Sequence, residues 1–274
     1  MSTRNRLLFF LVAWLIVLMP FLFWWSTWFG RTLSDAQLTQ YINDDKHPRH
    51  IQHALVQLGE RMARGDITTA RWYPDLLRLS SHPVEEVRNT DAWVMGQDTS
   101  RVESAAFHET LLKMLQDPSP TVRGNAALSL VRFGDAAGRP QIVALLRPAS
   151  VAAPATGRIV DIDKVGTSVR QGGLIAKLQN GESTSEIRAP IGGHVSRIAV
   201  ASGADIAANA EIATIEPSSE QIWEALRALY LVGEPDDLPA IRAYERDTSE
   251  IPDRLRQQAI LTEKSIQSRA AHKP

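Results

Sequence analysis

The chain begins with a long apolar run. Leu7 to Phe29 contains 23 residues and no charged side chain. At about 1.5 Å per residue, a helix of this length crosses the roughly 30 Å hydrocarbon layer of a membrane. Trp24, Trp25 and Trp28 lie at its far end, where interfacial aromatic residues are common. The run is too long for a signal peptide, and no small-residue cleavage site follows it. We therefore expect residues 7–29 to form an uncleaved transmembrane anchor.

The charges that flank this run predict its orientation. Arg4, Arg6 and the α-amine precede it, and Arg31 follows it directly. Positive charge is enriched on the cytoplasmic side of membrane segments. We expect residues 1–6 to be a cytoplasmic tail and the rest of the chain to lie outside the cytoplasm. In a bacterium this places the protein at the inner membrane, single-pass, with its bulk in the periplasm.

Amphipathic helical patterns extend from residue 34 to residue 147. Three segments share one order of residues, in which His or Asp precedes Pro and an apolar stretch follows: His47–Gly59, His82–Gly96 and Asp117–Leu130. Val87-Arg88 returns as Val122-Arg123 after 35 residues, and Gly59 returns as Gly96 after 37. A period in the high thirties built of helix pairs indicates an α-solenoid.

Between residues 151 and 217 the apolar positions alternate, which is typical of β-strands. Ala153-Pro154-x-x-Gly157-x-Ile159 returns 36 residues later as Ala189-Pro190-x-x-Gly193-x-Val195. Gly166 returns as Gly203 after 37 residues. A register held over this length indicates an internal duplication. We predict two copies of one β unit that bury their apolar faces against each other as a small closed sandwich.

The helical pattern resumes after the strands, over residues 218–268, and leaves 269–274 as a tail. Residues 138–147 predict the first helix of a fourth pair, and the segment from Ser218 predicts its second helix. The β stretch would then be inserted in the loop of this fourth pair. A plain series of helices, sandwich and helices is the alternative.

Both patterns resemble known families. The A-P-x-x-G-x-[IV] motif, present at Ala153 and again at Ala189, resembles the biotinyl/lipoyl domain, a barrel-sandwich hybrid that also occurs in periplasmic membrane fusion proteins. The helix pairs resemble HEAT repeats, whose second helix carries D-x-x-x-x-V-R-x-x-A-A, and the copy that starts at Asp117 matches best. Together with the N-terminal apolar run, which predicts one transmembrane helix, these resemblances imply a multidomain protein in which an all-β barrel-sandwich hybrid is inserted in an α-solenoid.

The biotinyl/lipoyl resemblance implies a prosthetic group attached to a lysine, and one position of this chain bears on that expectation. Biotin carriers hold a lysine in the hairpin turn between the two halves, and counting back from Ala189-Pro190 that position is occupied by Glu182. The nearest lysine, Lys177, lies in the preceding strand. A carboxylate cannot form the amide that attaches a prosthetic group, so we expect no cofactor. Export adaptors insert a long coiled-coil hairpin at the same place, where this chain has a short loop.

The amino-acid composition argues against several classes of function. The net charge is −1 and the pI is near 6.7, which does not favour binding to nucleic acid. The chain has no cysteine, which excludes disulfides, cysteine-ligated zinc and thiol catalysis. We find no nucleophile elbow, P-loop or zincin motif, and we expect no enzyme activity.

Three histidines follow one another at every third position. His50 and His53 share a helix face and are the candidate metal ligands, whereas His47 precedes Pro48 at the helix start. No carboxylate is recognisable on that face, so we expect a solvated polar face without a metal. The pairs Asp44-Asp45 and Glu85-Glu86 are interpreted as acids at helix N-termini.

These patterns lead to one functional hypothesis and two alternatives. Solenoids expose long surfaces that bind other proteins. We expect a non-catalytic, membrane-anchored periplasmic scaffold, an accessory or assembly subunit of an integral inner-membrane protein complex. A reduced membrane-fusion-type adaptor of an export system is the first alternative. A cofactor carrier or metal-site protein, which would use Lys177 or the histidines, is the second.

Overall fold

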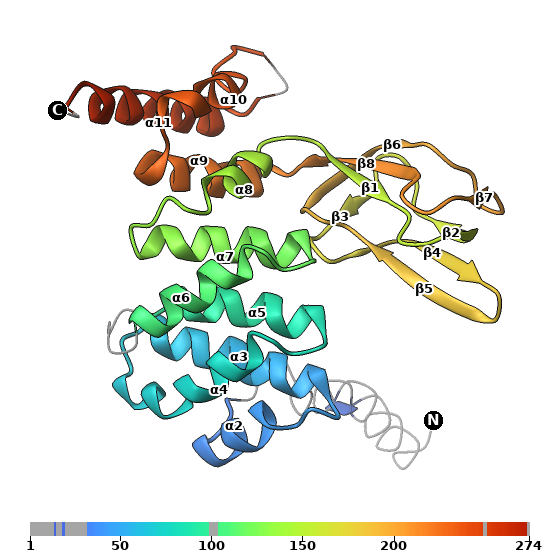
Figure 1. Ribbon diagram of the computed structural model, residues 1–274, viewed down its shortest axis with the longest axis horizontal. Coiled ribbons are helices and arrows are strands. Elements are labelled where there is room, and N and C mark those ends of the chain that lie inside the picture. The colour runs from blue at the N-terminus through green and yellow to red at the C-terminus, as the bar shows by residue number, and fades with distance from the viewer. Residues whose placement is uncertain (1–13, 15–17, 20–31, 99–103, 249–250, 273–274) are drawn as a thin grey trace, which may run out of the picture.

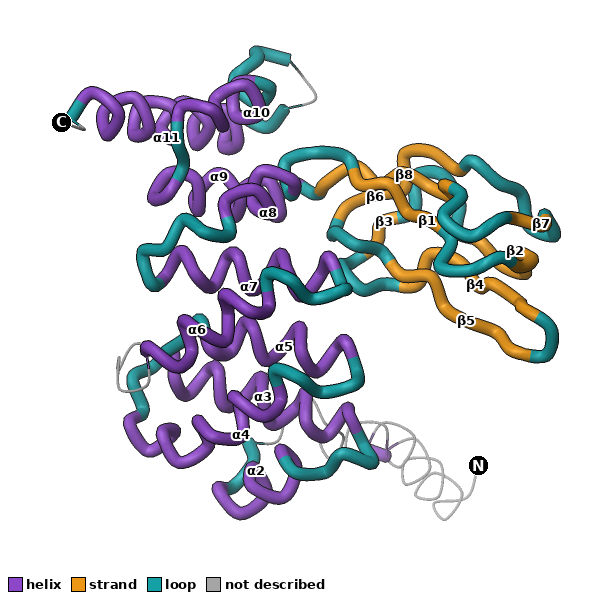
Figure 2. The backbone as a smooth tube through the Cα atoms, in the orientation of Figure 1, coloured by secondary structure: helices purple, strands orange, loops and turns teal. Residues whose placement is uncertain are grey.

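The computed structural model describes residues 14, 18–19, 32–98, 104–248 and 251–272. Stacked helix pairs form a solenoid, and a β domain projects from one of its edges (Figure 1). Helices and strands are segregated in space, with all strands on the projecting side (Figure 2). The prediction of a helical region joined to an all-β part in one multidomain chain is confirmed.

The predicted anchor lies almost entirely outside the described residues. Of residues 7–29, only Trp14, Leu18 and Met19 are described. Among the described residues, the structure contains no helix with both the length and the apolar character needed to cross a membrane.

The helices follow one another in pairs. They are α2 (Asp35–Ile42), α3 (Pro48–Ala63), the 3-10 helix η1 (Ile67–Trp72), α4 (Tyr73–Leu79), α5 (Glu85–Met95), α6 (Ser104–Met114), α7 (Pro120–Arg132), α8 (Arg139–Ala144), α9 (Ser219–Val232), η2 (Pro235–Asp237), α10 (Leu238–Arg242) and α11 (Asp253–Ala271). The second helices of successive pairs, α3, α5, α7, α9 and α11, pack one on the next. The solenoid core is therefore continuous from the first pair to the last.

Local chemistry starts several of these helices. Ser34 caps α2 in a capping box with Gln37, and the hydroxyls of Ser119 and Ser218 accept N–H groups in the first turns of α7 and α9. Glu85 and Glu86 lie in the first turn of α5, in agreement with their interpretation as N-terminal acids. The same interpretation is wrong for Asp44 and Asp45, which precede α3 in a turn, because that helix begins only at Pro48.

The 37-residue spacing between two glycines has a steric cause. A Cβ on Gly59 would lie 2.6 Å from the Trp93 ring, and a Cβ on Gly96 would lie 2.4 Å from Ser129 Oγ. Both glycines face the second helix of the following pair. Close approach of neighbouring helices therefore requires glycine at the same point of two successive repeats.

The turns inside the pairs repeat one hydrogen-bond pattern. Asp117 Oδ1 accepts the N–H of Ser119 at 2.8 Å, and 35 residues earlier His82 Nδ1 accepts the N–H of Val84 at 3.1 Å. Arg88 joins the two turns, because it donates to the His82 carbonyl at 2.8 Å and to both oxygens of Asp117 at 2.7 and 2.9 Å. Burial disfavours the charged form of Asp117, but the bonds from Arg88 and Ser119 outweigh it and lower the pKa of Asp117.

In the described part of the chain, eight strands lie between α8 and α9. They are β1 (Ala149–Ala152), β2 (Gly157–Ile162), β3 (Ser168–Val169), β4 (Leu174–Asn180), β5 (Ser183–Arg188), β6 (Gly193–Ile198), β7 (Asp205–Ile206) and β8 (Glu211–Pro217). They form two four-stranded antiparallel sheets with strand orders β1-β8-β6-β3 and β5-β4-β2-β7. Among the described residues these two sheets do not close into a barrel, in contrast to the closed sandwich expected from the sequence.

The duplication seen in the sequence relates the two sheets. Each sheet takes two central strands from one half of the domain and its two outer strands from the other half. Strands β8 and β6 pair with β1 and β3, and strands β4 and β2 pair with β5 and β7. Equivalent core residues are fully buried, Ile159 with Val195 and Leu178 with Ile215. Gly172 and Asn209, 37 residues apart, have φ of 73° and 65°. The two halves therefore share one backbone path even where the side chains differ.

Hydrogen bonds tie the β domain to the helices. The Gln221 side chain of α9 donates to the Leu145 carbonyl at 3.0 Å and accepts the Gly192 N–H at 2.9 Å. Tyr244, which follows α10, donates to the Leu146 carbonyl at 2.6 Å and so holds the chain segment that leads into the β domain. At the other side of the junction, Arg188 at the end of β5 lies 3.5 Å from Glu86 in α5. These contacts hold the β domain in one orientation against the solenoid.

We expect Arg88→Ala to destabilise the solenoid by about 3 kcal/mol, because it leaves the nearly buried carboxylate of Asp117 without its partner. Urea unfolding of the purified chain measures the loss. The difference in unfolding free energy between the native chain and the variant should become smaller as the pH falls through the lowered pKa of Asp117. A protonated carboxyl is neutral and does not require the Arg88 cation.

The matched control is Asp247→Ala. Asp247 is 89% exposed and pairs with Arg256 at 2.6 Å, so we expect a change below about 0.5 kcal/mol. Equal losses in the two variants would contradict a structural role for the Arg88–Asp117 pair.

Candidate functional site

Three ligand-type side chains meet in the turn between α2 and α3. Asp44 Oδ1 lies 2.9 Å from His47 Nδ1, and Asp44 Oδ2 lies 2.7 Å from His50 Nδ1. We call Asp44, His47 and His50 the histidine cluster. Their ligand atoms all lie within 4.8 Å of one another, and within the described residues no other group of three His, Asp or Glu side chains meets this criterion.

The backbone of the turn brings these side chains together. The His47 N–H donates to the Asp44 carbonyl at 2.9 Å, and the His50 N–H donates to the His47 carbonyl at 2.7 Å. Pro48 occupies the first position of α3, where its fixed φ suits a helix start. The Tyr41 ring stacks on His50 with centroids 4.4 Å apart and an interplanar angle of 13°. The three ligand groups are therefore presented on one compact turn.

The sequence identified only part of this cluster. Of its two candidates, His50 belongs to the cluster, whereas His53 Nε2 lies 2.8 Å from the side-chain nitrogen of Gln57. Burial and the neighbouring His50 lower the pKa of His53. The carboxylate is supplied by Asp44, and the third ligand by His47. The period of three from Asp44 to His50 was a usable signal, but it runs through a turn and not along one helix.

Hydrogen bonds from His50 and then His47 lower the pKa of Asp44, so its carboxyl is charged at neutral pH. The cluster is open to solvent on one side, since the His47 side chain is 62% exposed, while those of His50 and Asp44 are 27% and 25% exposed. This combination of two imidazoles and a carboxylate with an open side offers the ligand types of a divalent metal ion.

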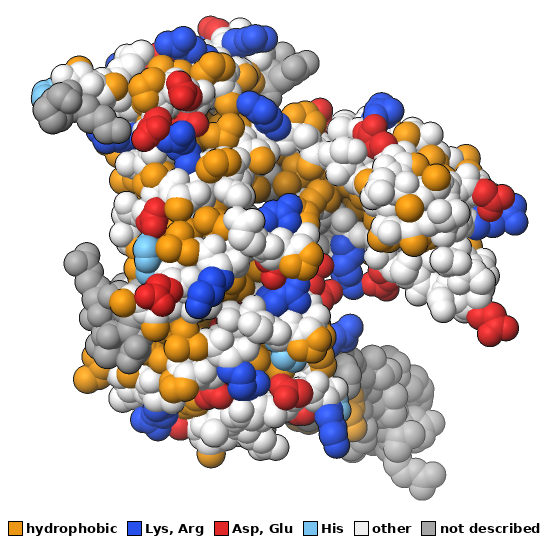
Figure 3. All heavy atoms as spheres, viewed as in Figure 1, with side chains coloured by type: hydrophobic (Ala, Val, Ile, Leu, Met, Phe, Trp, Pro, Cys, Tyr) orange, Lys and Arg blue, Asp and Glu red, His pale blue; other side chains and the backbone are white. Residues whose placement is uncertain are grey.

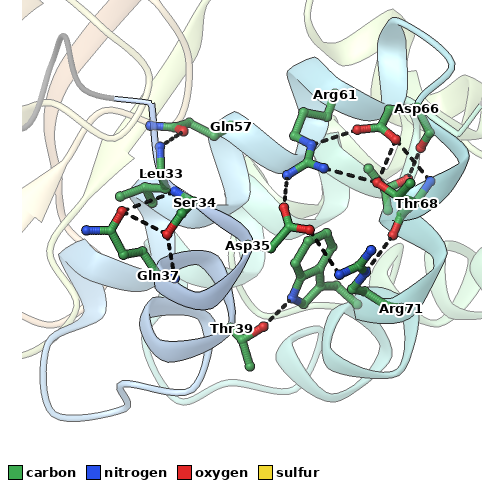
Figure 4. Close-up of polar contacts among 12 residues, drawn as sticks. Leu33, Ser34, Asp35, Gln37, Thr39, Gln57, Arg61, Asp66, Thr68 and Arg71 are labelled. Atoms are coloured by element: carbon green, nitrogen blue, oxygen red, sulfur yellow. Dashed lines mark hydrogen bonds and ion pairs between the residues drawn. The ribbon is translucent and has the colours of Figure 1, made fainter.

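A second polar network holds α2 against the rest of the first pair (Figure 4). Arg61 donates to Asp35 at 2.7 Å and to Asp66 at 2.8 Å, and Arg71 donates to the other oxygen of Asp35 at 2.9 Å. Both guanidinium groups lie over the Trp72 ring, 5.3 and 5.0 Å from its centroid. This network connects the first described helix to α3 and η1.

The network also fixes the charge of its acids. Bonds from the Thr68 hydroxyl, from Arg61 and from the Thr68 N–H lower the pKa of Asp66 to about 2. Nearby, the Leu33 N–H donates to Gln57 Oε1 at 2.7 Å. The segment that leads into α2 is therefore attached to the same face of α3 that carries His53.

The tip of the β4–β5 hairpin contains no lysine. The hairpin closes through the two-residue turn Gly181-Glu182, with Gly181 at φ 60°. Lys177 lies within β4, paired across the ladders with Asp161 and Glu186. Glu182 thus occupies the exposed tip where the biotinyl/lipoyl resemblance requires an amine.

Strand β5 is an edge of its sheet, and its free side is exposed. Asn180 and Ser183 flank the two-residue turn and form a hydrogen-bonded pair of the ladder. Hydrogen-bonded and non-hydrogen-bonded pairs alternate along an antiparallel ladder, so the N–H and C=O groups of Thr184 and Glu186 point away from β4. Among the described residues, neither backbone N–H donates to another backbone carbonyl outside the ladder. Figure 3 shows the surface hollowed between this part of the β domain and the helices beside it.

One buried acid breaks the repeat pattern. Asp91 in α5 occupies the place that Ala126 takes 35 residues later, and both residues are fully buried. Neither carboxyl oxygen of Asp91 has a hydrogen-bond partner among the described residues. Burial raises the pKa of Asp91 well above its usual range, and the positive charge of Arg78 opposes this only in part.

Comparison with known protein families identifies one of the helix pairs. A model of the HEAT repeat matches residues 109–137, which include the second half of α6 and all of α7. This confirms the HEAT prediction for the helix pair that contains Asp117, which is the copy that matched the HEAT motif best. No curated protein matches the chain.

Among solved structures, the chain is similar to a single-chain, multi-domain long-chain acyl-CoA carboxylase. The two are 13% identical with a TM-score of 0.25, and the match covers 35% of this chain and 10% of the carboxylase. The chain thus corresponds to about a tenth of that protein, and a likeness at this level carries no argument about fold or activity.

We expect Asp91→Asn to be more stable than the native chain at neutral pH. The raised pKa of Asp91 means that the unfolded chain loses this proton at a lower pH than the folded chain does, so stability falls as the pH rises above the unfolded pKa. Asparagine has nearly the same shape and does not ionise. The gain should be about 1.4 kcal/mol for each unit of pKa shift.

Urea unfolding of both proteins at pH 4 and pH 7 tests this. The gain should be larger at pH 7 than at pH 4. An equal difference at both pH values would show that Asp91 ionises in the folded protein as it does in the unfolded chain.

Proposed function

We propose that this protein is a non-catalytic, membrane-anchored periplasmic scaffold, an accessory or assembly subunit of an integral inner-membrane protein complex. Residues 7–29 are its anchor in this proposal, and the strands between β1 and β8 form a biotinyl/lipoyl-like domain that has lost its acceptor lysine. The observation that carries the proposal is the exposed edge of β5, held in a fixed orientation beside the solenoid.

The chemistry of this edge supports a role in protein binding. Main-chain groups of Thr184 and Glu186 offer the donors and acceptors that an added strand needs. Exposed edge strands are normally protected by short length, proline, bulges or inward-pointing charges. Five of the six residues of β5 are exposed, and the strand contains no proline. An edge of this kind favours an extended segment of a partner protein as its occupant.

The junction with the solenoid supports the same role. Arg188 donates to Glu186 at 2.5 Å and to the Gly172 carbonyl at 2.7 Å, and it also lies beside Glu86 of α5. Arg188 thus links β5 to α5, and Gln221 links the β domain to α9 through its two bonds. A partner bound at β5 would therefore contact a preorganised surface, which lowers the entropy cost of binding.

We expect Thr184→Pro to abolish capture of the partner complex and Thr184→Ala to retain it. Proline removes the N–H that points away from β4 and leaves the β4–β5 ladder intact, whereas alanine removes only the side chain. Each full-length variant is purified from its native membrane in mild detergent, and the bound proteins are quantified by mass spectrometry.

Three results would count against the scaffold. Equal capture by the two variants would exclude the β5 edge as the binding surface. Recovery of an ATP-driven permease with an outer-membrane channel would favour the export adaptor. Self-association into rings through the β domain would do the same.

We expect the intact mass of the protein to equal that of its polypeptide, because no lysine lies in the Gly181-Glu182 turn. Intact-protein mass spectrometry of material from native membranes measures this. An added mass on Lys177 would instead identify a carrier of a prosthetic group.

A further inference from the structure

We propose that the histidine cluster binds a divalent transition-metal ion of the zinc class, with one ligand each from Asp44, His47 and His50. The proposal goes beyond the scaffold function and stands independently of it. It rests on the geometry of the turn between α2 and α3, which brings together two imidazoles and a carboxylate that the sequence pattern did not combine.

The distances are compatible with coordination. Metal–ligand bonds of about 2.0–2.1 Å in a tetrahedral site place neighbouring ligand atoms roughly 3.3 Å apart. The two Nδ1 atoms now lie 2.9 and 2.7 Å from the Asp44 oxygens, at hydrogen-bond distance. A shift of a few tenths of an ångström outward would replace these hydrogen bonds with bonds to a metal. The imidazole protons would then reside on the Nε2 atoms, as ligation through Nδ1 requires.

The turn is preorganised for this exchange. His50 is held by the stacked Tyr41 ring and by its place in the first turn of α3, and Asp44 is held by its backbone contact with His47. His47 is the most exposed of the three and leaves one side of the site open. A metal with three protein ligands and water in the remaining position fits such a site.

The charges around the cluster suit a dication. The rings of His47 and His50 have centroids 5.0 Å apart, and the Asp44 carboxylate lies within hydrogen-bond distance of both. A metal ion binds both imidazoles in their neutral form and places its charge next to Asp44. Asp45 is the next residue along the chain and adds a second negative charge, which it shares with Arg78 at 3.5 Å.

The ion would have a structural consequence. Asp44 follows α2 and His50 lies in α3, so a bound metal would cross-link the two helices of the first pair. This pair also contains the Arg61 network and the attachment of Leu33 to Gln57. Metal binding would therefore stabilise the first helix pair of the solenoid.

The test uses the full-length chain in detergent, without an affinity tag and stripped of metal with a chelator. Calorimetric titration with Zn²⁺ should show one equivalent bound per chain. Titration with Co²⁺ should give the visible absorption bands of a low-symmetry site with nitrogen and oxygen ligands. Saturating Zn²⁺ should raise the Tm by a few degrees.

His47→Ala and Asp44→Asn should each weaken Zn²⁺ binding by about 100-fold or more, since each removes one of three ligands. His53→Ala and His194→Ala are matched controls outside the cluster and should bind as the native chain does. Because His47 is exposed, its replacement leaves the fold intact, and circular dichroism without metal checks this.

Failure of the native chain to bind Zn²⁺ at one equivalent would overturn the proposal. Binding that survives in both His47→Ala and Asp44→Asn would also overturn it. Loss of binding in the His53→Ala control would move the site along α3 and reject the cluster as assigned.

Discussion

The solenoid continues past its inserted β domain because α8 and α9, the helices on either side of the insertion, pack against each other. The chain leaves the solenoid after Leu146, forms an entire β domain, and must return so that Ser218 can start α9 against the helix it left. Gln221 makes this return specific. Its side-chain amide donates a hydrogen bond to the Leu145 carbonyl, just before the insertion, and accepts one from the Gly192 N–H in the β domain. One side chain thus joins the two ends of the insertion and the inserted domain itself. The contact completes the fourth helix pair, and α9 continues the core through its packing on α7 and α11.

The stacked second helices provide the rigid support for that arrangement. Glycines at the crossing points, such as Gly96 against Ser129, allow the helices to approach closely. The Arg88–Asp117 pair and the repeated turn geometry keep successive turns in register along one edge. Because the β domain extends from the same edge, its position relative to the turns follows from the stacking. The surface next to β5 is therefore shaped by both domains together.

Local departures from the repeat pattern are concentrated in the first two pairs. His82 takes the place of Asp117, Asp91 takes the place of Ala126, and the first turn carries the histidine cluster. Asp91 places a titratable group where the later repeat has an alanine, whereas His82 replaces one titratable residue with another. Positions where local rules are broken without an evident gain in stability are where function is expected. In this protein those positions lie in the first two helix pairs, which follow in the chain the segment for which the sequence predicts a membrane anchor.

The amino-acid sequence alone specified the order of the elements. Periods of 35 to 37 residues defined both the helix pairs and the two halves of the β domain, because repeated units must bury equivalent apolar positions. The place of Glu182 at the hairpin tip was also predictable, since it follows from counting along one short turn. The separation of the strands into two sheets was not predictable, because strands from the two halves exchange partners, as β7 does with β2. Which polar groups meet depends on how the elements pack in three dimensions. Asp44, His47 and His50 are spaced by three in the chain, but they meet across a turn and not along one helix face. Arg188 reaches Glu86 across two domains, and no sequence pattern predicts that contact.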